Sequence, residues 1–202
     1  MREARGWEVA ETALTAGESV IFLTPHLGCF EITSLFIARN HPLGVLYRPP
    51  RKAWLEPLIV AGRQRGHVQL AQTNMQGVRK LLLALKKGGA VGILPDQVPH
   101  GGEGEWADFF GRPAYTMTLV SRLAQSSGAK VFLVFGERLS WGRGYIFHVE
   151  PVPAAGVATV AALNATIEAA VRRRPEQYLW SYPRHKVPGD APPIPLKSKG
   201  HL

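Results

Sequence analysis

Short apolar runs rich in β-branched and aromatic residues alternate along this chain with longer stretches of helical periodicity. The apolar runs are 19–24, 44–47, 67–71, 90–94, 131–135 and 145–150, and the helical stretches are 3–15, 30–39, 53–64, 76–87, 116–127 and 157–172. Such alternation is typical of repeated strand–helix units. The pattern therefore predicts an α/β fold with a mixed, largely parallel sheet flanked by helices.

The chain shows no repeat and no linker, so we expect one domain over residues 1–186 and an irregular Pro-rich tail over residues 187–202. A hydrophobic fraction of 46% permits a core and excludes intrinsic disorder. The one cysteine, Cys29, excludes a disulfide framework. The apolar runs are far shorter than the roughly 20 residues of a membrane-spanning helix, and no secretory signal pattern opens the chain. Residues 95–113 have no period and are predicted to form a long loop.

The positive charge of the chain is concentrated in one segment. The net charge is +9, and residues 32–95 contain ten basic residues and one acidic residue, Glu56, so this segment carries all of it. A local positive field indicates an anionic partner: a phosphorylated substrate, an anionic membrane surface or nucleic acid. Few aromatic residues lie among these cations, which argues against a surface that stacks nucleic-acid bases.

A histidine and a glutamate follow the first predicted strand in the order His26-Leu-Gly-Cys-Phe-Glu31. Ligands of α/β proteins bind beyond the carboxyl ends of the strands, where His26 is expected. A carboxylate from Glu31 behind the imidazole would make a general base. The alternative is a capping or core histidine beside a surface glutamate. Cys29 could act as a nucleophile, but a small buried thiol is the commoner case.

Polar residues also follow the next strands. Arg48 comes directly after the strand 44–47, and Arg63 and Arg65 close the helix 53–64. Each cluster alone fits a solvated face, but two clusters after successive strands favour an anion site. Asp96 and Gln97 follow the strand 90–94, where they could face a ligand or form an Asx turn.

Six blocks stand in one order along the chain. They are His26-x4-Glu31, Tyr47-Arg-Pro49, Gly62-Arg-x-Arg65, Leu94-Pro-Asp-Gln97, Phe109-Phe-Gly-x-Pro-Ala114 and Pro175-Glu-Gln-Tyr-x-Trp180. Over roughly residues 20–186 the chain thereby resembles the bacterial lipid A biosynthesis acyltransferases, which are lauroyl or myristoyl transferases of the lysophospholipid acyltransferase superfamily. The resemblance implies a glycerolipid acyltransferase-like fold. The closing block of that family usually reads Trp-x-His-Arg-Arg-Phe-Lys, whereas this chain has Trp180-Ser-Tyr-Pro-Arg184-His-Lys186.

The resemblance implies a reaction and a set of site residues. A fatty acyl chain would move from acyl carrier protein to a hydroxyl of a phosphorylated glycolipid, a lipid A precursor. His26 would be the general base, Glu31 would orient and charge-balance it, and Arg48 would lie at the phosphate or hold the acyl donor. Arg63, Arg65, Asp96 and Gln97 would line the same cleft. No metal or organic cofactor is implied.

The resemblance also implies a place in the cell. Family members usually carry a membrane-anchoring helix before the histidine block, but here only 25 residues precede His26. We therefore expect a truncated or short form that binds peripherally to the anionic cytoplasmic face of the bacterial inner membrane. The alternatives are another phospholipid or glycolipid acceptor, an inactive fragment, or a basic domain that binds nucleic acid. Nucleic acid is the least expected partner.

Overall fold

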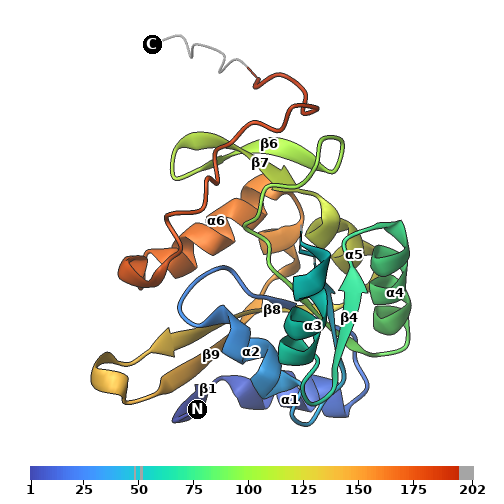
Figure 1. Ribbon diagram of the computed structural model, residues 1–202, viewed down its shortest axis with the longest axis vertical. Coiled ribbons are helices and arrows are strands. Elements are labelled where there is room, and N and C mark those ends of the chain that lie inside the picture. The colour runs from blue at the N-terminus through green and yellow to red at the C-terminus, as the bar shows by residue number, and fades with distance from the viewer. Residues whose placement is uncertain (48, 51, 196–202) are drawn as a thin grey trace.

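The computed structural model describes residues 1–47, 49–50 and 52–195, which form six α-helices, a seven-stranded sheet and a two-stranded sheet (Figure 1). The strands are β1 (Glu3–Arg5), β2 (Val20–Leu23), β3 (Leu43–Tyr47), β4 (Val68–Gln72), β5 (Ala90–Ile93), β6 (Gly104–Phe109), β7 (Arg112–Met117), β8 (Lys130–Arg138) and β9 (Tyr145–Val152). The helices are α1 (Trp7–Thr15), α2 (Phe30–Ile37), α3 (Glu56–Arg63), α4 (Met75–Lys86), α5 (Leu119–Ser127) and α6 (Val160–Val171).

The large sheet has the strand order β1-β9-β8-β2-β5-β3-β4. Strands β2, β3, β4, β5 and β8 are parallel, β9 is antiparallel to β8, and β1 is parallel to β9. The prediction of an α/β fold with a mixed, largely parallel sheet is therefore confirmed. Each predicted strand and helix is present, with ends shifted by a few residues.

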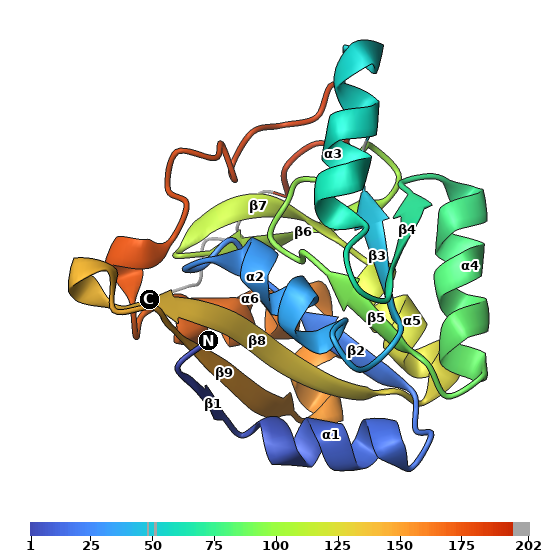
Figure 2. The same ribbon diagram turned by 60° about the horizontal axis from the view of Figure 1, so that its bottom comes forward.

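Helices cover both faces of the sheet, which explains why its central strands are continuous apolar runs. Phe22 of β2 packs on one face in a cluster with residues of α1 and α2, and Leu23 packs on the other face with residues of α4, α5 and α6. Figure 2 shows α2 on the near side of β8 and α6 behind it. The same view shows α3 rising away from the sheet at the top.

The predicted helix 3–15 is wrong at its beginning. Residues Glu3–Arg5 form β1, and α1 begins only at Trp7 because Gly6 has a left-handed φ of 75°. Strand β1 pairs with the outer edge of β9, with Glu3 opposite Ile146. Three residues, two of them charged, are too few to show a pattern that predicts a strand. Pairing with the free edge of the sheet therefore determines β1.

The prediction of an irregular loop is confirmed for residues 95–103, but its second part, residues 104–113, and the start of the predicted helix 116–127 are wrong. Residues from Gly104 to Met117 form the antiparallel β6–β7 hairpin, which turns at Phe110 and Gly111 with φ values of 48° and 74°. Asn-Gly usually occupies such a turn. Phe110 tolerates its positive φ because its backbone N–H donates to Glu168 Oε1 (2.7 Å) and its ring packs against Trp180.

The segment that follows Lys186 is irregular as far as it is described. It contains no helix or strand between residues 187 and 195, and it runs beside the β6–β7 hairpin in Figure 1. The Trp106 indole donates to the Pro192 carbonyl (2.7 Å), and the Gly101 N–H donates to Asp190 Oδ1 (3.0 Å). Among the described residues, no helix is long and apolar enough to cross a membrane.

Gly17 and Gly28 both have a positive φ, but only Gly28 is closely packed, so comparing them distinguishes the cost of backbone strain from the cost of lost packing. A Cβ on Gly28 (φ 63°) would lie 2.1 Å from the Gly136 carbonyl oxygen, whereas a Cβ on Gly17 (φ 72°) would meet nothing within 4 Å. Left-handed strain alone should make Gly17→Ala cost about 1 kcal/mol of the free energy of unfolding. Gly28→Ala should cost about 3 kcal/mol, because the backbones must also separate. Urea unfolding measures both, and equal costs would contradict the close packing.

Candidate active site

The pairing of two neighbouring strands brings His26 and Asp96 together. Leu23 of β2 lies opposite Ile93 of β5, and the Thr24 N–H donates to the Ile93 carbonyl (2.9 Å). His26 and Asp96 each lie three residues beyond this pair. β2 and β5 are neighbours in the sheet. After β2 the chain continues to β3, which lies beyond β5, and after β5 it continues through the β6–β7 hairpin to β8, which lies beyond β2 on the other side. Ligand sites of open α/β sheets form where the strand order reverses in this way.

The imidazole of His26 is held by the carboxylate of Asp96. Asp96 Oδ1 lies 2.9 Å from His26 Nδ1, and Asp96 Oδ2 accepts the His26 backbone N–H at 2.9 Å. A carboxylate only accepts hydrogen bonds, so Nδ1 carries the proton and Nε2 of the neutral ring keeps its lone pair. The side-chain nitrogen of Gln97 lies 3.3 Å from Nε2. In this tautomer Nε2, the nitrogen that faces Gln97, is the ring atom able to accept a proton.

Two side chains near the carboxyl end of the chain surround Asp96, which is only 1% exposed. Burial, and then Asp96, raise the pKa of the Tyr178 hydroxyl, which stays protonated and hydrogen-bonds to the carboxylate. Burial lowers the pKa of the Arg184 guanidinium, and the charge of Asp96 opposes this effect. Arg184 donates to the Tyr115 carbonyl (2.8 Å) and to Thr116 Oγ1 (2.7 Å).

The backbone around Tyr178 also fixes the loop that carries His26. The Gly28 N–H donates to the Gln177 carbonyl (2.9 Å), and the Leu179 N–H donates to the His26 carbonyl (3.0 Å). Tyr178 and Arg184 were not among the residues predicted for the site, although Tyr178 lies in the last of the six family blocks. The block from Pro175 to Trp180 was the available signal, but no spacing in it indicates a contact with residues 26–28.

Glu31 occupies a different place from the one predicted for it. It lies in the first turn of α2, half-exposed, and its carboxylate forms an ion pair with Arg63 (2.7 Å). The contact with Nδ1 that we expected from Glu31 is made by Asp96. Glu31, Arg63 and His26 nevertheless line one cleft, so a role for Glu31 in the reaction stays a prediction.

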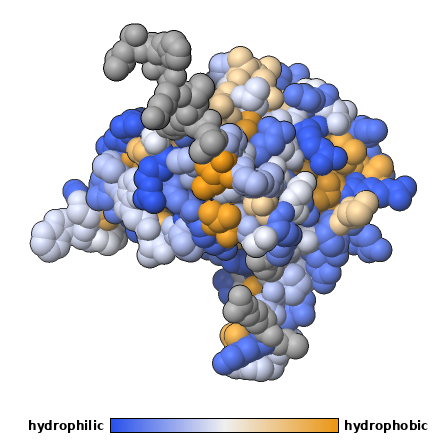
Figure 3. Space-filling model, turned by 90° about the horizontal axis from the view of Figure 1, so that it is seen from above, coloured by the Kyte–Doolittle hydropathy of each residue, from blue (hydrophilic) through white to orange (hydrophobic). Residues whose placement is uncertain are grey.

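The cleft has a volume of about 770 Å³ and lies over the carboxyl ends of the strands. Apolar side chains line it from both faces of the sheet. Those on the α2 face include Phe22, Ile37, Leu43, Val45, Val68 and Leu70, and those on the α4–α5 face include Leu46, Val78, Leu82, Ile93, Leu119 and Leu123. Among the described residues, the Lys and Arg side chains that line it are those of Arg63, Arg79, Arg122 and Lys186. In the view from above in Figure 3, small groups of apolar side chains lie between hydrophilic ones.

The structure brings some of the predicted site residues together and not others. His26, Glu31, Arg63 and Gln97 line the cleft, while Asp96 lies behind the imidazole instead of on the cleft wall. Arg65 is exposed beyond the end of α3 and does not line the cleft. Arg48 lies outside the described residues.

Cys29 is half-buried and does not line the cleft. Its backbone N–H donates to the Gly136 carbonyl (2.7 Å). No group of three metal-ligating side chains occurs in the part of the chain that the structure describes. The site therefore consists of a histidine–aspartate pair, an amide and the surrounding cations.

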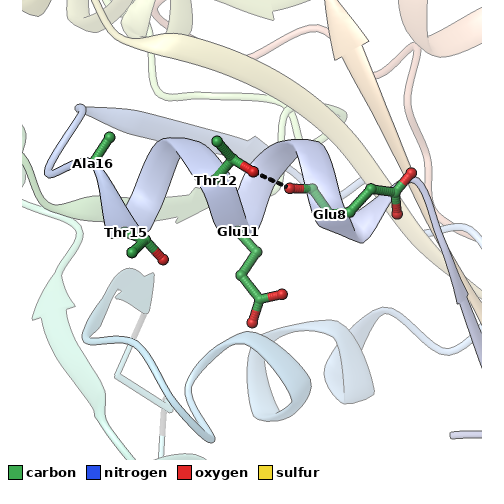
Figure 4. Close-up of a pocket in the computed structure, with 5 residues that line it drawn as sticks. All are labelled: Glu8, Glu11, Thr12, Thr15 and Ala16. Carbon is green, nitrogen blue, oxygen red and sulfur yellow. Dashed lines mark hydrogen bonds between the residues drawn. The ribbon is translucent and has the colours of Figure 1, made fainter.

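A shallow depression on α1 is separate from this cleft. Its lining residues are Glu8, Glu11, Thr12, Thr15 and Ala16 (Figure 4). The Thr12 hydroxyl donates to the Glu8 carbonyl oxygen (2.7 Å), as the dashed line in Figure 4 marks. The lining has two carboxylates and no basic residue, so it does not suit an anionic ligand.

Comparison with known proteins places the chain in a family. Residues 2–187 match the family described as bacterial lipid A biosynthesis acyltransferase. The chain belongs to this family. It is 29% identical over 195 residues to the lipid A biosynthesis palmitoleoyltransferase of Escherichia coli (strain K12), covering 92% of this chain and 61% of that protein.

Other relatives are similarly distant. The chain is 28% identical over 182 residues to a lipid A biosynthesis acyltransferase of Haemophilus influenzae, covering 87% of this chain and 56% of that protein. It is 29% identical over 172 residues to the lipid A biosynthesis lauroyltransferase of Escherichia coli (strain K12), covering 82% of this chain and 54% of that protein. The chain thus spans between half and two thirds of the length of the curated relatives it matches.

Exchanging the two carboxylates separately should show which one serves His26. Asp96→Asn keeps the side-chain shape but has one acceptor oxygen, so it cannot accept from both Nδ1–H and the backbone N–H of His26. Comparable changes in histidine–aspartate pairs lower kcat by about 10⁴-fold. Glu31→Gln breaks an exposed ion pair at the cleft, so its effect should be smaller and should appear in KM. Steady-state rates of acyl transfer measure both. A large fall in kcat for Glu31→Gln, with Asp96→Asn fully active, would assign the partnership to Glu31.

Proposed function

We propose that this chain is the catalytic domain of an acyltransferase that moves a fatty acyl chain from acyl carrier protein to a hydroxyl of a phosphorylated glycolipid in lipid A biosynthesis. One observation carries the proposal: the His26 imidazole, held from behind by Asp96, lines an apolar cleft that also contains cationic residues. Family membership supports the reaction class. The printed names of the relatives support the acceptor class.

His26 would perform both proton transfers of the reaction. Nε2 takes the proton of the acceptor hydroxyl as its oxygen attacks the thioester carbonyl carbon, and Asp96 stabilises the imidazolium that forms. The tetrahedral intermediate then expels the thiolate, so a C–O bond forms and the C–S bond breaks. The imidazolium returns its proton to the thiolate. No metal or organic cofactor takes part in this sequence.

The α2 side of the cleft would hold the transferred acyl chain. Its walls come from β2, β3, β4 and α2 and are mainly apolar, as the desolvation of a fatty chain requires. Each CH₂ moved from water into such a cleft stabilises the complex by roughly 0.8 kcal/mol. Phe30 of α2 packs against the His26 imidazole, with 4.6 Å between the ring centroids, and it also lines the cleft.

The cations of the cleft would bind the phosphate of the acceptor. Among the cations that line the cleft, Arg63 lies nearest in sequence to the Tyr47-Arg-Pro49 block. Lys186 reaches the cleft from the segment after Arg184. Guanidinium groups bind phosphate oxygens with charge-assisted hydrogen bonds. In this assignment Glu31 holds Arg63 in place through their ion pair.

The region around α3 would contact an anionic membrane at the cytoplasmic face of the bacterial inner membrane. α3, all of whose residues the structure describes, buries none of its side chains and rises from the molecule in Figure 2. Trp54 is 72% exposed and Leu58 is 71% exposed, and the exposed Lys52 and Arg65 lie at either end of this region. Exposed Trp and Leu beside basic residues suit the headgroup region of a bilayer, where each cation adds about 1 kcal/mol.

Removal of the base should abolish most of the reaction. We expect His26→Ala to lower kcat by about 10²- to 10⁴-fold when dodecanoyl acyl carrier protein and a phosphorylated glucosamine disaccharide lipid are supplied. Mass spectrometry identifies the product. The matched control is His148→Gln, since His148 also pairs with a carboxylate (Glu137, 2.8 Å) but does not line the cleft.

Undiminished transfer by His26→Ala would overturn the assignment of the base. Transfer by the wild-type chain to a different phospholipid or glycolipid, with none to the disaccharide, would keep the mechanism and change the acceptor. Absence of transfer to every acceptor would overturn the proposed function.

Gly92 of β5 should influence the length of the acyl chain. It lines the cleft, and a Cβ at this position would meet the Val45 side chain at 3.5 Å, which is ordinary van der Waals contact. A larger side chain would therefore fill part of the cleft without a clash against backbone. We expect Gly92→Val to lower kcat/KM for tetradecanoyl and hexadecanoyl donors by about tenfold, which is the cost of losing one or two buried CH₂ groups. Decanoyl donors should be unaffected, and an equal loss for all lengths would contradict this placement.

A further inference from the structure

The outer face of α4 combines cationic and apolar side chains. Met75, Arg79, Leu83 and Lys86 follow each other at spacings of four, four and three residues, so they form one stripe along the helix. Met75 is 90% exposed and Leu83 is 49% exposed. In Figures 1 and 2, α4 lies at the right-hand edge of the molecule with no other element on its outer side.

This face keeps its positive charge unneutralised. Helices α4 and α5 contain no Asp or Glu, and their exposed cations, with the residue that follows α4, are Arg79, Lys80, Lys86, Lys87 and Arg122. Within the described ranges, none of these five lies within 4.0 Å of a carboxylate. Some cations elsewhere are paired, such as Arg63 with Glu31 and Lys130 with Glu18, but those on α4 and α5 stand together on one face. The charge of the α4–α5 face is therefore available to a partner.

The same face is continuous with the cleft. Arg79 of α4 and Arg122 of α5 are exposed and also line the cleft, beside Leu82, Leu119 and Leu123. A group that enters between the two cations would pass apolar side chains on its way to His26. Exposed residues of α4 and α5 therefore form part of the wall of the cleft.

We propose that the α4–α5 face is the docking surface for an acidic carrier protein, which delivers its thioester-linked acyl chain through the entrance between Arg79 and Arg122. The inference rests on the proposed function, which requires a thioester donor. Cations spaced along one helix, with Leu83 among them, complement an amphipathic helix whose exposed residues are acidic. Steering by such a face accelerates encounter with an acidic partner.

An acidic protein fits this face better than a membrane does. The aromatic side chain expected at a bilayer interface is Trp54, near α3, whereas α4 carries no aromatic residue. Leu83 is flanked by cations and is only half-exposed, so it could insert little apolar area into a bilayer. The two surfaces lie on different parts of the molecule in Figure 2, so a membrane and a carrier protein could be bound together.

The test variant is Lys80→Glu/Lys86→Glu in the full chain, since both side chains are exposed and neither lines the cleft. Donors are dodecanoyl acyl carrier protein and dodecanoyl pantetheine, which share the thioester but differ in the acidic protein. We expect KM for the carrier-linked donor to rise about tenfold and to lose most of its dependence on salt. The kinetic constants for dodecanoyl pantetheine should not change.

The matched control is Arg138→Glu/Arg143→Glu. It makes the same change in net charge on the β8–β9 hairpin, at the opposite edge of the molecule in Figures 1 and 2. KM for the carrier-linked donor should stay within about twofold of wild type if local and not global charge decides docking. A second variant, Leu83→Ser, should raise the same KM without a change in charge.

Each other outcome overturns the inference in a distinguishable way. An unchanged KM for the carrier-linked donor would show that the face does not bind it, and an equal rise for both donors would place the effect inside the cleft. Loss of binding to vesicles with anionic lipids, with carrier binding intact, would make α4 a membrane surface. If the wild-type chain transfers from neither donor, the proposed function fails, and calorimetric binding of the acyl carrier protein still decides docking.

Discussion

The buried carboxylate of Asp96 is the group on which the rest of the site depends. An ionised carboxylate that is removed from water loses several kcal/mol of solvation unless donors replace the water. Here the donors are Nδ1 and the backbone N–H of His26 and the hydroxyl of Tyr178, with the guanidinium of Arg184 nearby. The contacts that offset the burial of Asp96 also orient the His26 imidazole. The same hydrogen bonds therefore stabilise the fold and set the geometry of the candidate site.

These donors come from parts of the chain that are far apart in sequence. The loop after β2 supplies the imidazole, the turn after β5 supplies the carboxylate, and the segment after α6 supplies Tyr178 and Arg184. The last segment also closes the loop of His26 through backbone hydrogen bonds of Gln177 and Leu179. A chain that ended after α6 would therefore lose the support of Asp96 even though every strand of the large sheet would remain.

The difference between Glu31 and Asp96 shows what the sequence could and could not predict. Local patterns predicted the strand that ends before His26, the helix that contains Glu31 and the strand that ends before Asp96, and the structure contains all three. The partner of His26 depends on the strand order, because β5 lies beside β2 only when it inserts between β2 and β3. Spacing within one strand–loop–helix unit carries no information on that insertion. It therefore favoured Glu31, the nearest carboxylate in sequence, although Asp96 is the nearest in space.

The two missed β elements have the same kind of explanation. β1 exists because β9 offers a free edge, and the β6–β7 hairpin exists because α6 offers an apolar surface and Asn164, whose side chain donates to the Asp108 carbonyl (3.0 Å). The hairpin turn has an aromatic residue, Phe110, where glycine or asparagine is usual, and its contacts with Glu168 and Trp180 make that conformation acceptable. Tertiary contacts therefore determine these elements, whereas the central strands are determined by their own apolar composition.

In the proposed function, the strand order lets one histidine meet both a carrier-linked acyl donor and a lipid acceptor. β3 pairs with β5 over only three residues, Leu43 to Val45, so the cleft above this short edge receives side chains from both faces of the sheet. In the proposed function the carrier-linked donor enters from the α4–α5 face and the membrane-bound acceptor from the side of α3. In this proposal the two routes would meet at Nε2 of His26, where proton transfer would require both reactants. A single-faced cleft would force the donor and the acceptor to compete for one entrance, and in this proposal the position of His26 at the reversal of strand order would avoid that competition.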